Sequence, residues 1–365
     1  MEIGQYLELM VAKGASDIFF TTGAPPQLKV EGRIANITGR AFAPGEVHTI
    51  ACSIMNRAQS QSFEENWELD MAFSMPRVGR FRVNVFRQRG ETALVIRHIK
   101  EVIPTIAQLH LPAILSDLVM DQRGLILVVG TTGSGKSTTL ASMIEHRNLN
   151  AAGHILTIED PIEFFHVSKK SIVNQREVGT DTKSYGSALR RAMREAPDLI
   201  LIGEVRDTET MDHAMAYADT GHLCLSTLHA TSANQTLERI VNFFPREIHS
   251  RLLSDLAINL RAVVSQRLIN GIDGKRVPAV EIMINTPHIA DLIAKGEITG
   301  IKSAMEQINI AGMQTFDQSL YQLFTEKKIT EEEALRHADS RNDLGLRIRL
   351  HRDKGVMTPV GLSLS

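Results

Sequence analysis

Apolar and polar positions follow different periods in different parts of the chain, and these periods predict its elements. Over residues 80–87 apolar and polar residues alternate, which is the period of a half-buried strand. The predicted strands of the first hundred residues are 17–22, 28–37, 80–87 and 92–99. A helix is predicted over 46–66, with turns at 23–26 and 88–91. Together these elements predict a mixed α/β domain over residues 1–99.

The rest of the chain has a different pattern. Residues 100–114 contain Pro104 and Pro112, which disfavour a continuous helix, and are predicted to be a linker. Short apolar runs alternate with helical segments over residues 115–274, and these runs are 125–130, 154–158, 199–203 and 223–227. The alternation predicts a mostly parallel sheet with helices on both faces. Residues 275–352 are predicted to be mainly helical, and 353–365 to be a disordered tail.

Composition narrows the class of protein. The 365 residues are enough for two or three domains, and 43% hydrophobic with 22% charged residues is typical of a globular chain. A net charge of −2 argues against nucleic acid as the main ligand. Two cysteines, Cys52 and Cys224, are too few for a four-cysteine zinc site and predict a reduced, cytoplasmic protein. Because no apolar run reaches roughly 18 residues, we expect only peripheral membrane association, through partners.

One segment has the pattern of a phosphate-binding loop. It matches G-x-x-x-x-G-K-[ST] and consists of Gly130, Thr131, Thr132, Gly133, Ser134, Gly135, Lys136, Ser137 and Thr138. Glycines let backbone N–H groups wrap the phosphates, Lys136 supplies positive charge, and Ser137 offers a hydroxyl to Mg²⁺. An apolar run precedes the loop and a predicted helix follows it, as this loop requires. We therefore predict that the chain binds ATP with magnesium.

Two acidic segments follow apolar runs, at the edge of the sheet where such folds bind ligands. The first is the sequence Glu-Asp-Pro-Ile-Glu over 159–163, which is either a solvated loop ended by proline or a source of catalytic carboxylates. The second is Glu204, which is either an ordinary strand-end acid or a magnesium-supporting one. Gly203 occupies the position where many P-loop proteins carry a magnesium-binding aspartate.

Basic side chains near the predicted sheets have two interpretations as well. Arg80 and Arg82 share one face of the predicted strand 80–87, and Arg97 lies on the predicted strand 92–99. They form either a solvated polar face or a source of arginines that stabilise charge on a transferring phosphate. His229 lies at the end of an apolar run, where it is either structural or a sensor of the γ-phosphate.

Four motifs in this order resemble those of the bacterial secretion ATPase superfamily. They correspond to its Walker A, Asp box, Walker B and His box, and they are residues 130–138, 157–164, 202–207 and 220–230. Residues 106–112 and 312–317 further resemble the twitching-motility branch of PilT and PilU. The similarity extends to about residue 345.

The resemblance implies a fold and a setting. The fold would be α/β: an N-terminal PAS-like domain, then a RecA-like P-loop core, then a helical C-terminal region. Such proteins form homo-hexameric rings at the cytoplasmic face of the inner membrane and dock on the platform protein of a type IV pilus machine. The reaction would be ATP hydrolysis with Mg²⁺, coupled to pilus retraction.

The resemblance also implies roles for individual residues. Glu163 would be the general base that activates water, and Glu204 would support the magnesium ion together with Ser137. Arg82 and Arg97 would reach the phosphates from the N-terminal domain. His229 would link the γ-phosphate to domain closure.

The branch within the superfamily follows from two departures. Assembly and secretion ATPases usually carry a four-cysteine zinc module, which this chain lacks. Residues 288–294 read His-Ile-Ala-Asp-Leu-Ile-Ala where PilT has Ala-Ile-Arg-Asn-Leu-Ile-Arg, which favours a PilU-like accessory of a PilT-type ATPase. The alternatives are an assembly or type II secretion ATPase, a nucleic-acid motor, and a nucleotide-sensing scaffold without catalysis. A nucleic-acid motor is disfavoured by 5% aromatic residues.

Overall fold

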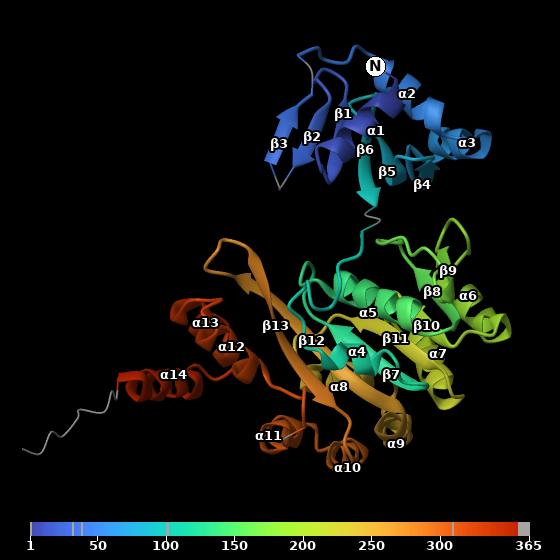
Figure 1. Ribbon diagram of the computed structural model, residues 1–365. Helices are drawn as coiled ribbons and strands as arrows, with labels where there is room; N and C mark the ends of the chain where they lie inside the picture. The colour runs from blue at the N-terminus through green and yellow to red at the C-terminus, as the bar shows by residue number, and fades with distance from the viewer. Residues whose placement is uncertain (1, 31–32, 38, 100–101, 309, 357–365) are drawn as a thin grey trace, which may run out of the picture. The chain divides into compact units, whose positions relative to one another are not determined.

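The computed structural model describes residues 2–30, 33–37, 39–99, 102–308 and 310–356. It divides into two compact units (Figure 1). The first unit is Met1–Val102 with Glu163–His166, and the second is Ile103–Ile162 with Val167–Ser365. Most of the predicted tail, residues 357–365, lies outside the described residues. Among the described helices, none has the length and apolar character needed to cross a membrane.

The first unit is an antiparallel sheet with helices packed on one face. The sheet order is β3-β2-β1-β6-β5-β4, with β1 (Asp17–Thr21), β2 (Gln27–Val30), β3 (Arg33–Asn36), β4 (Glu68–Met75), β5 (Gly79–Gln88) and β6 (Glu91–Ile99). The helices are α1 (Ile3–Ala12), α2 (Glu46–Ile54) and α3 (Arg57–Asn66). Leu7 of α1, Val47 of α2 and Phe63 of α3 share one core with Val83 and Ile96 of the sheet. Side chains of the other sheet face are therefore free of this core.

Two predictions for this unit were wrong in detail, and one strand was not predicted. The helix predicted over 46–66 is two helices, because Met55 is extended and the Asn56 side chain caps α3 by accepting from Gln59 N at 2.9 Å. The strand predicted over 28–37 is the antiparallel pair β2 and β3. Strand β4 was not predicted, although Leu69, Met71, Phe73 and Met75 alternate with mainly polar residues as in a half-buried strand.

The second unit is a seven-stranded sheet of order β13-β12-β7-β11-β10-β8-β9. Its strands are β7 (Gly124–Val129), β8 (Gly153–Glu159), β9 (Ser171–Glu177), β10 (Leu199–Ile202), β11 (Leu223–Leu228), β12 (Leu260–Asn270) and β13 (Arg276–Ile284). All neighbours are parallel except β12 and β13. Every residue of β7, β10 and β11 is buried, as continuous apolar runs predict.

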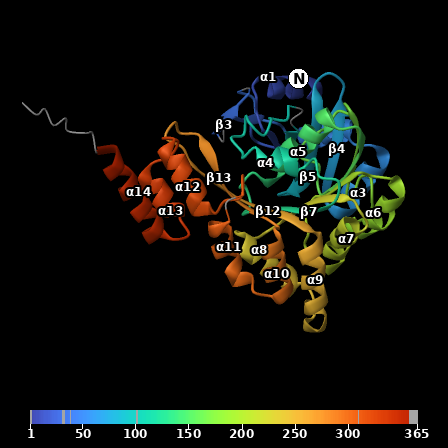
Figure 2. The ribbon, with the colours of Figure 1, turned by 60° about the horizontal axis from the view of Figure 1, so that its bottom comes forward.

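Helices cover both faces of this sheet (Figures 1 and 2). The helices are α4 (Ile114–Leu118), α5 (Lys136–Asn150), α6 (Tyr185–Ala192), α7 (Thr208–Asp219), α8 (Ala233–Asn242), α9 (His249–Asn259), α10 (Pro287–Lys295) and α11 (Ile301–Gln307). Helices α4 and α5 share a core with Ile126 and Val128, whereas α6 to α11 share another with Leu125 and Leu127. Alternate residues of β7 thus face opposite cores, which fixes the strand in the middle of the unit.

The C-terminal region begins with a strand where helix was predicted. Strands β12 and β13 form a hairpin whose turn is closed by Gly271 N donating to Lys275 O at 2.7 Å. Nearly all of β13 is buried, although Pro278 and Glu281 interrupt its apolar run and so argue against a buried strand in the sequence. The helices α12 (Phe316–Thr325), α13 (Glu331–His337) and α14 (Arg341–Val356) then pack on this hairpin. Helix α14 extends four residues past the predicted end of this region, residue 352.

Candidate nucleotide-binding site

The loop between β7 and α5 has the backbone of a phosphate-binding loop. Gly130 (φ 152°) and Gly135 (φ 94°) both adopt angles that side-chain-bearing residues rarely reach. A Cβ added to Gly130 would lie 2.4 Å from Ser134 Oγ, so this site has no room for one. Thr131, Thr132 and Gly133 are exposed at the top of the loop. Gly130 must therefore be glycine, because of its backbone φ and because a Cβ has no room there.

Lys136 places its charge inside this loop. It is the first residue of α5 and is nearly buried, and its Nζ donates to Gly130 O at 2.9 Å and to Thr131 O at 3.0 Å. The N-terminus of the fifteen-residue helix α5 also points its unpaired N–H groups at this point. Ammonium group and helix end together make the loop a site for an anion.

Three hydroxyl groups of the loop complete its polar lining. Ser134 Oγ is buried and makes no hydrogen bond within the described residues. Ser137 and Thr138 are half-buried on the first turn of α5. A buried hydroxyl without a partner costs free energy, which a bound phosphate would recover.

One neighbour of the loop, Gln266 of β12, was not singled out from the sequence. Its Oε1 accepts a hydrogen bond from Thr139 Oγ1 at 2.7 Å, and both residues are buried. These residues are 127 positions apart, and only the parallel pairing of β12 with β7 brings them together. A glutamine within an apolar run was the available signal, since a buried amide needs a partner.

Glu204 and His229 are brought together at the ends of two neighbouring strands. Glu204 comes two residues after β10 and His229 directly after β11, and these strands are parallel neighbours. His229 Nε2 lies 2.8 Å from Glu204 Oε1, and Arg206 Nε donates to Glu204 Oε2 at 2.6 Å. Both oxygens of Glu204 are thus occupied, and its side chain is only 16% exposed. Arg206 was not singled out from the sequence.

Gly203 is explained by what surrounds it. A Cβ there would lie 2.8 Å from the Tyr185 hydroxyl and 3.2 Å from Ile158 O, so any larger residue would require Tyr185 and the neighbouring backbone to shift. Burial, and next the nearby Asp160 carboxylate, raise the pKa of Tyr185 above its ordinary value, so the phenol stays neutral. The first carboxylate after β10 is instead that of the next residue, Glu204.

The acidic residues at and after the end of β8 have different partners. Glu159 Oε1 accepts from Thr157 Oγ1 at 2.7 Å, and Asp160 Oδ2 lies 3.6 Å from Arg206 Nη1. The Asp160–Pro161 peptide bond is cis. Glu163 falls in the four-residue segment, Glu163–His166, that groups with the first unit.

The predicted arginines lie side by side in the first unit. Arg82 of β5 is directly opposite Arg97 of β6, which is opposite Asp17 of β1. Arg97 Nε donates to the buried Asp17 Oδ1 at 2.8 Å, and Arg82 Nη2 lies 3.8 Å from Asp70 Oδ1. Like charges directly opposite repel, so the two carboxylates stabilise this arrangement. Arg97 remains 64% exposed and presents a cation on the sheet face away from the core.

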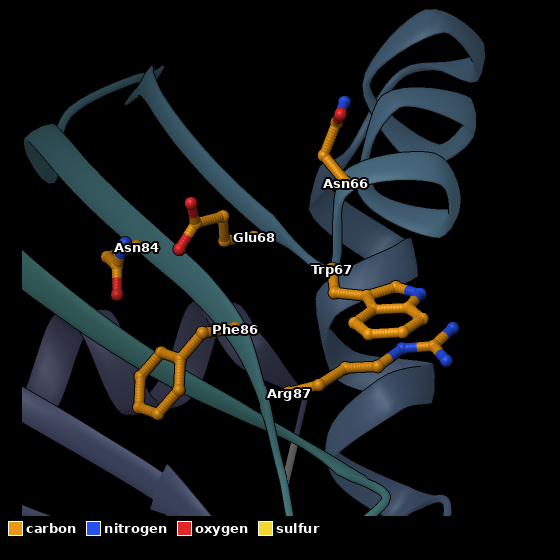
Figure 3. Close-up of a pocket in the computed structure, with 6 residues that line it drawn as sticks. All are labelled: Asn66, Trp67, Glu68, Asn84, Phe86 and Arg87. Atoms are coloured by element: carbon orange, nitrogen blue, oxygen red, sulfur yellow. The ribbon is translucent and has the colours of Figure 1, made fainter.

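A hollow elsewhere in the first unit does not share this chemistry (Figure 3). It is lined by Asn66, Trp67, Glu68, Asn84, Phe86 and Arg87. Figure 3 shows the Arg87 side chain beside the Trp67 indole, and Arg87 is paired with Glu64. The hollow lacks the glycine loop and helix N-terminus of a phosphate site, so the β7–α5 loop is the candidate site for a nucleotide.

Comparison with known proteins agrees with the motifs. The model of the family described as Type II/IV secretion system protein matches residues 2–340. The type IV pilus ATPase PilU of Pseudomonas aeruginosa is 52% identical over 351 residues, which cover 96% of this chain and 92% of PilU. PilT of the same organism, a type IV pilus retraction ATPase, is 44% identical over 92% of this chain and 97% of PilT.

Solved structures give the same result. The crystal structure of the pilus retraction motor PilT with bound ADP matches with a TM-score of 0.89 and 42% identity, over 95% of this chain and 99% of that one. The ATPase DotB of Legionella pneumophila matches with a TM-score of 0.75 and 28% identity, over 91% and 94%. The predicted fold class and the predicted resemblance are thereby confirmed.

Replacing Gly135 with alanine should weaken nucleotide binding by at least about tenfold. A left-handed alanine costs about 1–2 kcal/mol, and its Cβ would lie 2.9 Å from Gln266 Nε2. Calorimetric titration with ADP measures the effect. Gly274→Ala is the matched control, because Gly274 has φ 77° and open space around it but lies in the β12–β13 turn. Equal affinity in Gly135→Ala and the wild type would contradict this assignment.

Proposed function

The chain belongs to the Type II/IV secretion system protein family and is an ATPase, and we propose that it powers the retraction of type IV pili. The observation that carries this proposal is 52% identity to PilU over 96% of the chain. Identity to PilT is lower, at 44%, which supports a PilU-like accessory role beside a PilT-type ATPase. The two proteins would act on the same fibre.

We further propose that the working form is a homo-hexameric ring at the cytoplasmic face of the inner membrane. Identical subunits that contact each other head to tail close into a ring when the rotation between them closes. ATP bound at the β7–α5 loop and hydrolysed there would change the angle between neighbouring units by hinge closure. The inner-membrane platform protein of the pilus machine would receive this motion.

The loop residues would bind the triphosphate in the way their geometry allows. Backbone N–H groups of 130–138 would surround the β-phosphate, and Lys136 Nζ would exchange its loop carbonyls for phosphate oxygens. A magnesium ion would be held by the phosphates and the Ser137 hydroxyl, with Glu204 as its support in the protein. When bound, it neutralises charge that develops on the phosphates.

The remaining roles concern the attacking water and the transferred phosphate. Glu163 would accept the proton of the water, and Arg82 and Arg97 would stabilise negative charge on the phosphate. His229 would report the state of the nucleotide through its contact with Glu204, which is 2.8 Å long. Arg206 holds the other oxygen of Glu204, so it fixes the orientation of that carboxylate.

If Glu163 is the general base, replacing it should slow ATP hydrolysis without weakening nucleotide binding. Glu163→Gln should lower the rate of ATP hydrolysis by about 10²–10⁴-fold, because the amide cannot accept the proton. The dissociation constant for ADP should stay unchanged. Steady-state turnover and calorimetry on the purified variant measure both, with the exposed Glu306→Gln as control. Normal turnover in Glu163→Gln would exclude it as the base, and the same pair of measurements tests Arg82→Ala and Arg97→Ala.

The cellular role is tested by imaging labelled pili in cells that carry Lys136→Ala in place of the wild-type chain. With a fully active PilT-type partner we expect retraction to persist, and with an impaired partner we expect it to be lost. Loss in both backgrounds would make this chain the principal retraction motor. Retraction unchanged in both backgrounds would contradict the proposal and favour an assembly or secretion ATPase.

A further inference from the structure

We infer that Gln266 of β12 is a positioning residue of the nucleotide site, which holds the phosphate loop and the first turn of α5 in their binding shape. The inference rests on the proposed function, since it assigns the nucleotide to the β7–α5 loop. Gln266 itself lies beneath the loop and contacts protein groups, so its effect on the nucleotide is indirect.

The first contact is a buried hydrogen bond to the helix. Thr139 Oγ1 donates to Gln266 Oε1 at 2.7 Å, and the exposed fractions of the two residues are 1% and 4%. Thr139 N donates to Gly135 O at 2.9 Å, so the same residue is also tied to the last glycine of the loop. Gln266 thereby fixes the turn of α5 that follows Lys136.

The second contact is close packing against both ends of the loop. A Cβ on Gly135 would lie 2.9 Å from Gln266 Nε2, and a Cβ on Gly130 would lie 2.5 Å from Gln266 O. The side-chain amide of Gln266 therefore lies against the loop where it enters α5, and its backbone carbonyl lies against the loop where it leaves β7. Of these two contacts, only the one made by the amide depends on the side chain at this position.

The direction of the side chain follows from the register of the sheet. Ser265 is paired with Val129, the last residue of β7, so Gln266 lies level with the start of the loop. Along β12 the side chains alternate: Val264 joins the core beneath α5, whereas Ser265 donates to the buried Glu281 at 3.3 Å, a carboxylate that accepts from Ala233 N of α8. Ser265 and Gln266 are thus neighbours that serve opposite faces of one strand.

Loss of the amide has a specific consequence for nucleotides. An apolar side chain of similar length would leave the Thr139 hydroxyl buried without its acceptor and would free the start of α5. ATP and ADP both place a β-phosphate in such a loop, so both should lose affinity to the same extent. Loss of binding that is equal in ground state and transition state raises KM and leaves kcat nearly unchanged.

The test uses the purified full-length chain with Gln266→Met. Calorimetric titration with ADP and with a non-hydrolysable ATP analogue should show affinities about tenfold lower for both. The KM for ATP should rise by a similar factor, with kcat within about twofold of the wild type. Thr139→Val, which lacks the hydroxyl, should lower nucleotide affinity by the same factor as Gln266→Met. Thr139→Ser, which keeps the hydroxyl, should bind nucleotide like the wild type. The double variant Gln266→Met with Thr139→Val should bind no more weakly than either single variant.

Ser265→Ala is the matched control, because it removes a buried polar group from the same strand on the opposite face. It should leave nucleotide affinity unchanged whatever it does to the melting temperature. The inference is overturned if Gln266→Met binds ADP like the wild type, if it lowers kcat with affinity intact, or if Ser265→Ala weakens binding equally. Absence of nucleotide binding by the wild type itself would overturn the proposed function as well.

Discussion

The site depends on one constraint: an anion must be surrounded by backbone N–H groups at the end of a strand that is itself fixed. Strand β7 is fixed because all six of its residues are buried between two cores. The loop that follows needs positive φ at Gly130, Gly133 and Gly135, and a lysine whose charge stays inside. Any shift of β7 would move the loop and the start of α5 together.

The parallel pairing of β10 and β11 is enough to bring Glu204 and His229 together. Because β10 and β11 are parallel neighbours, the residues that follow them meet at one edge, and Glu204 contacts His229 there. Arg206 and His229 occupy both oxygens of that carboxylate. This arrangement suits a group that orients others, and it leaves proton transfer to a different carboxylate, for which Glu163 is our proposal.

Features set by residues close together in the sequence were predicted, whereas contacts made by strand pairing between distant residues were not. The phosphate loop was visible because its glycines, lysine and hydroxyls lie within nine residues, and the buried strands because their apolar runs are continuous. The β12–β13 hairpin was missed because Ser265 and Gln266 interrupt the apolar run of β12, and Pro278 and Glu281 interrupt that of β13. Gln266 was missed because its partners, Thr139 and the loop glycines, are more than 120 positions away and meet it only through strand pairing. The break at Asn56 depends on one side-chain cap inside a helical pattern.

We propose that this loop binds ATP and that hydrolysis of the ATP drives the motor. The most direct measurement is steady-state ATP hydrolysis by the purified chain, wild type against Lys136→Ala, at equal concentration and oligomeric state. We predict magnesium-dependent hydrolysis by the wild type and loss of hydrolysis in the variant, because the variant lacks the charge that Lys136 Nζ places inside the loop. A Lys136→Ala variant that hydrolyses ATP at the wild-type rate would contradict the account.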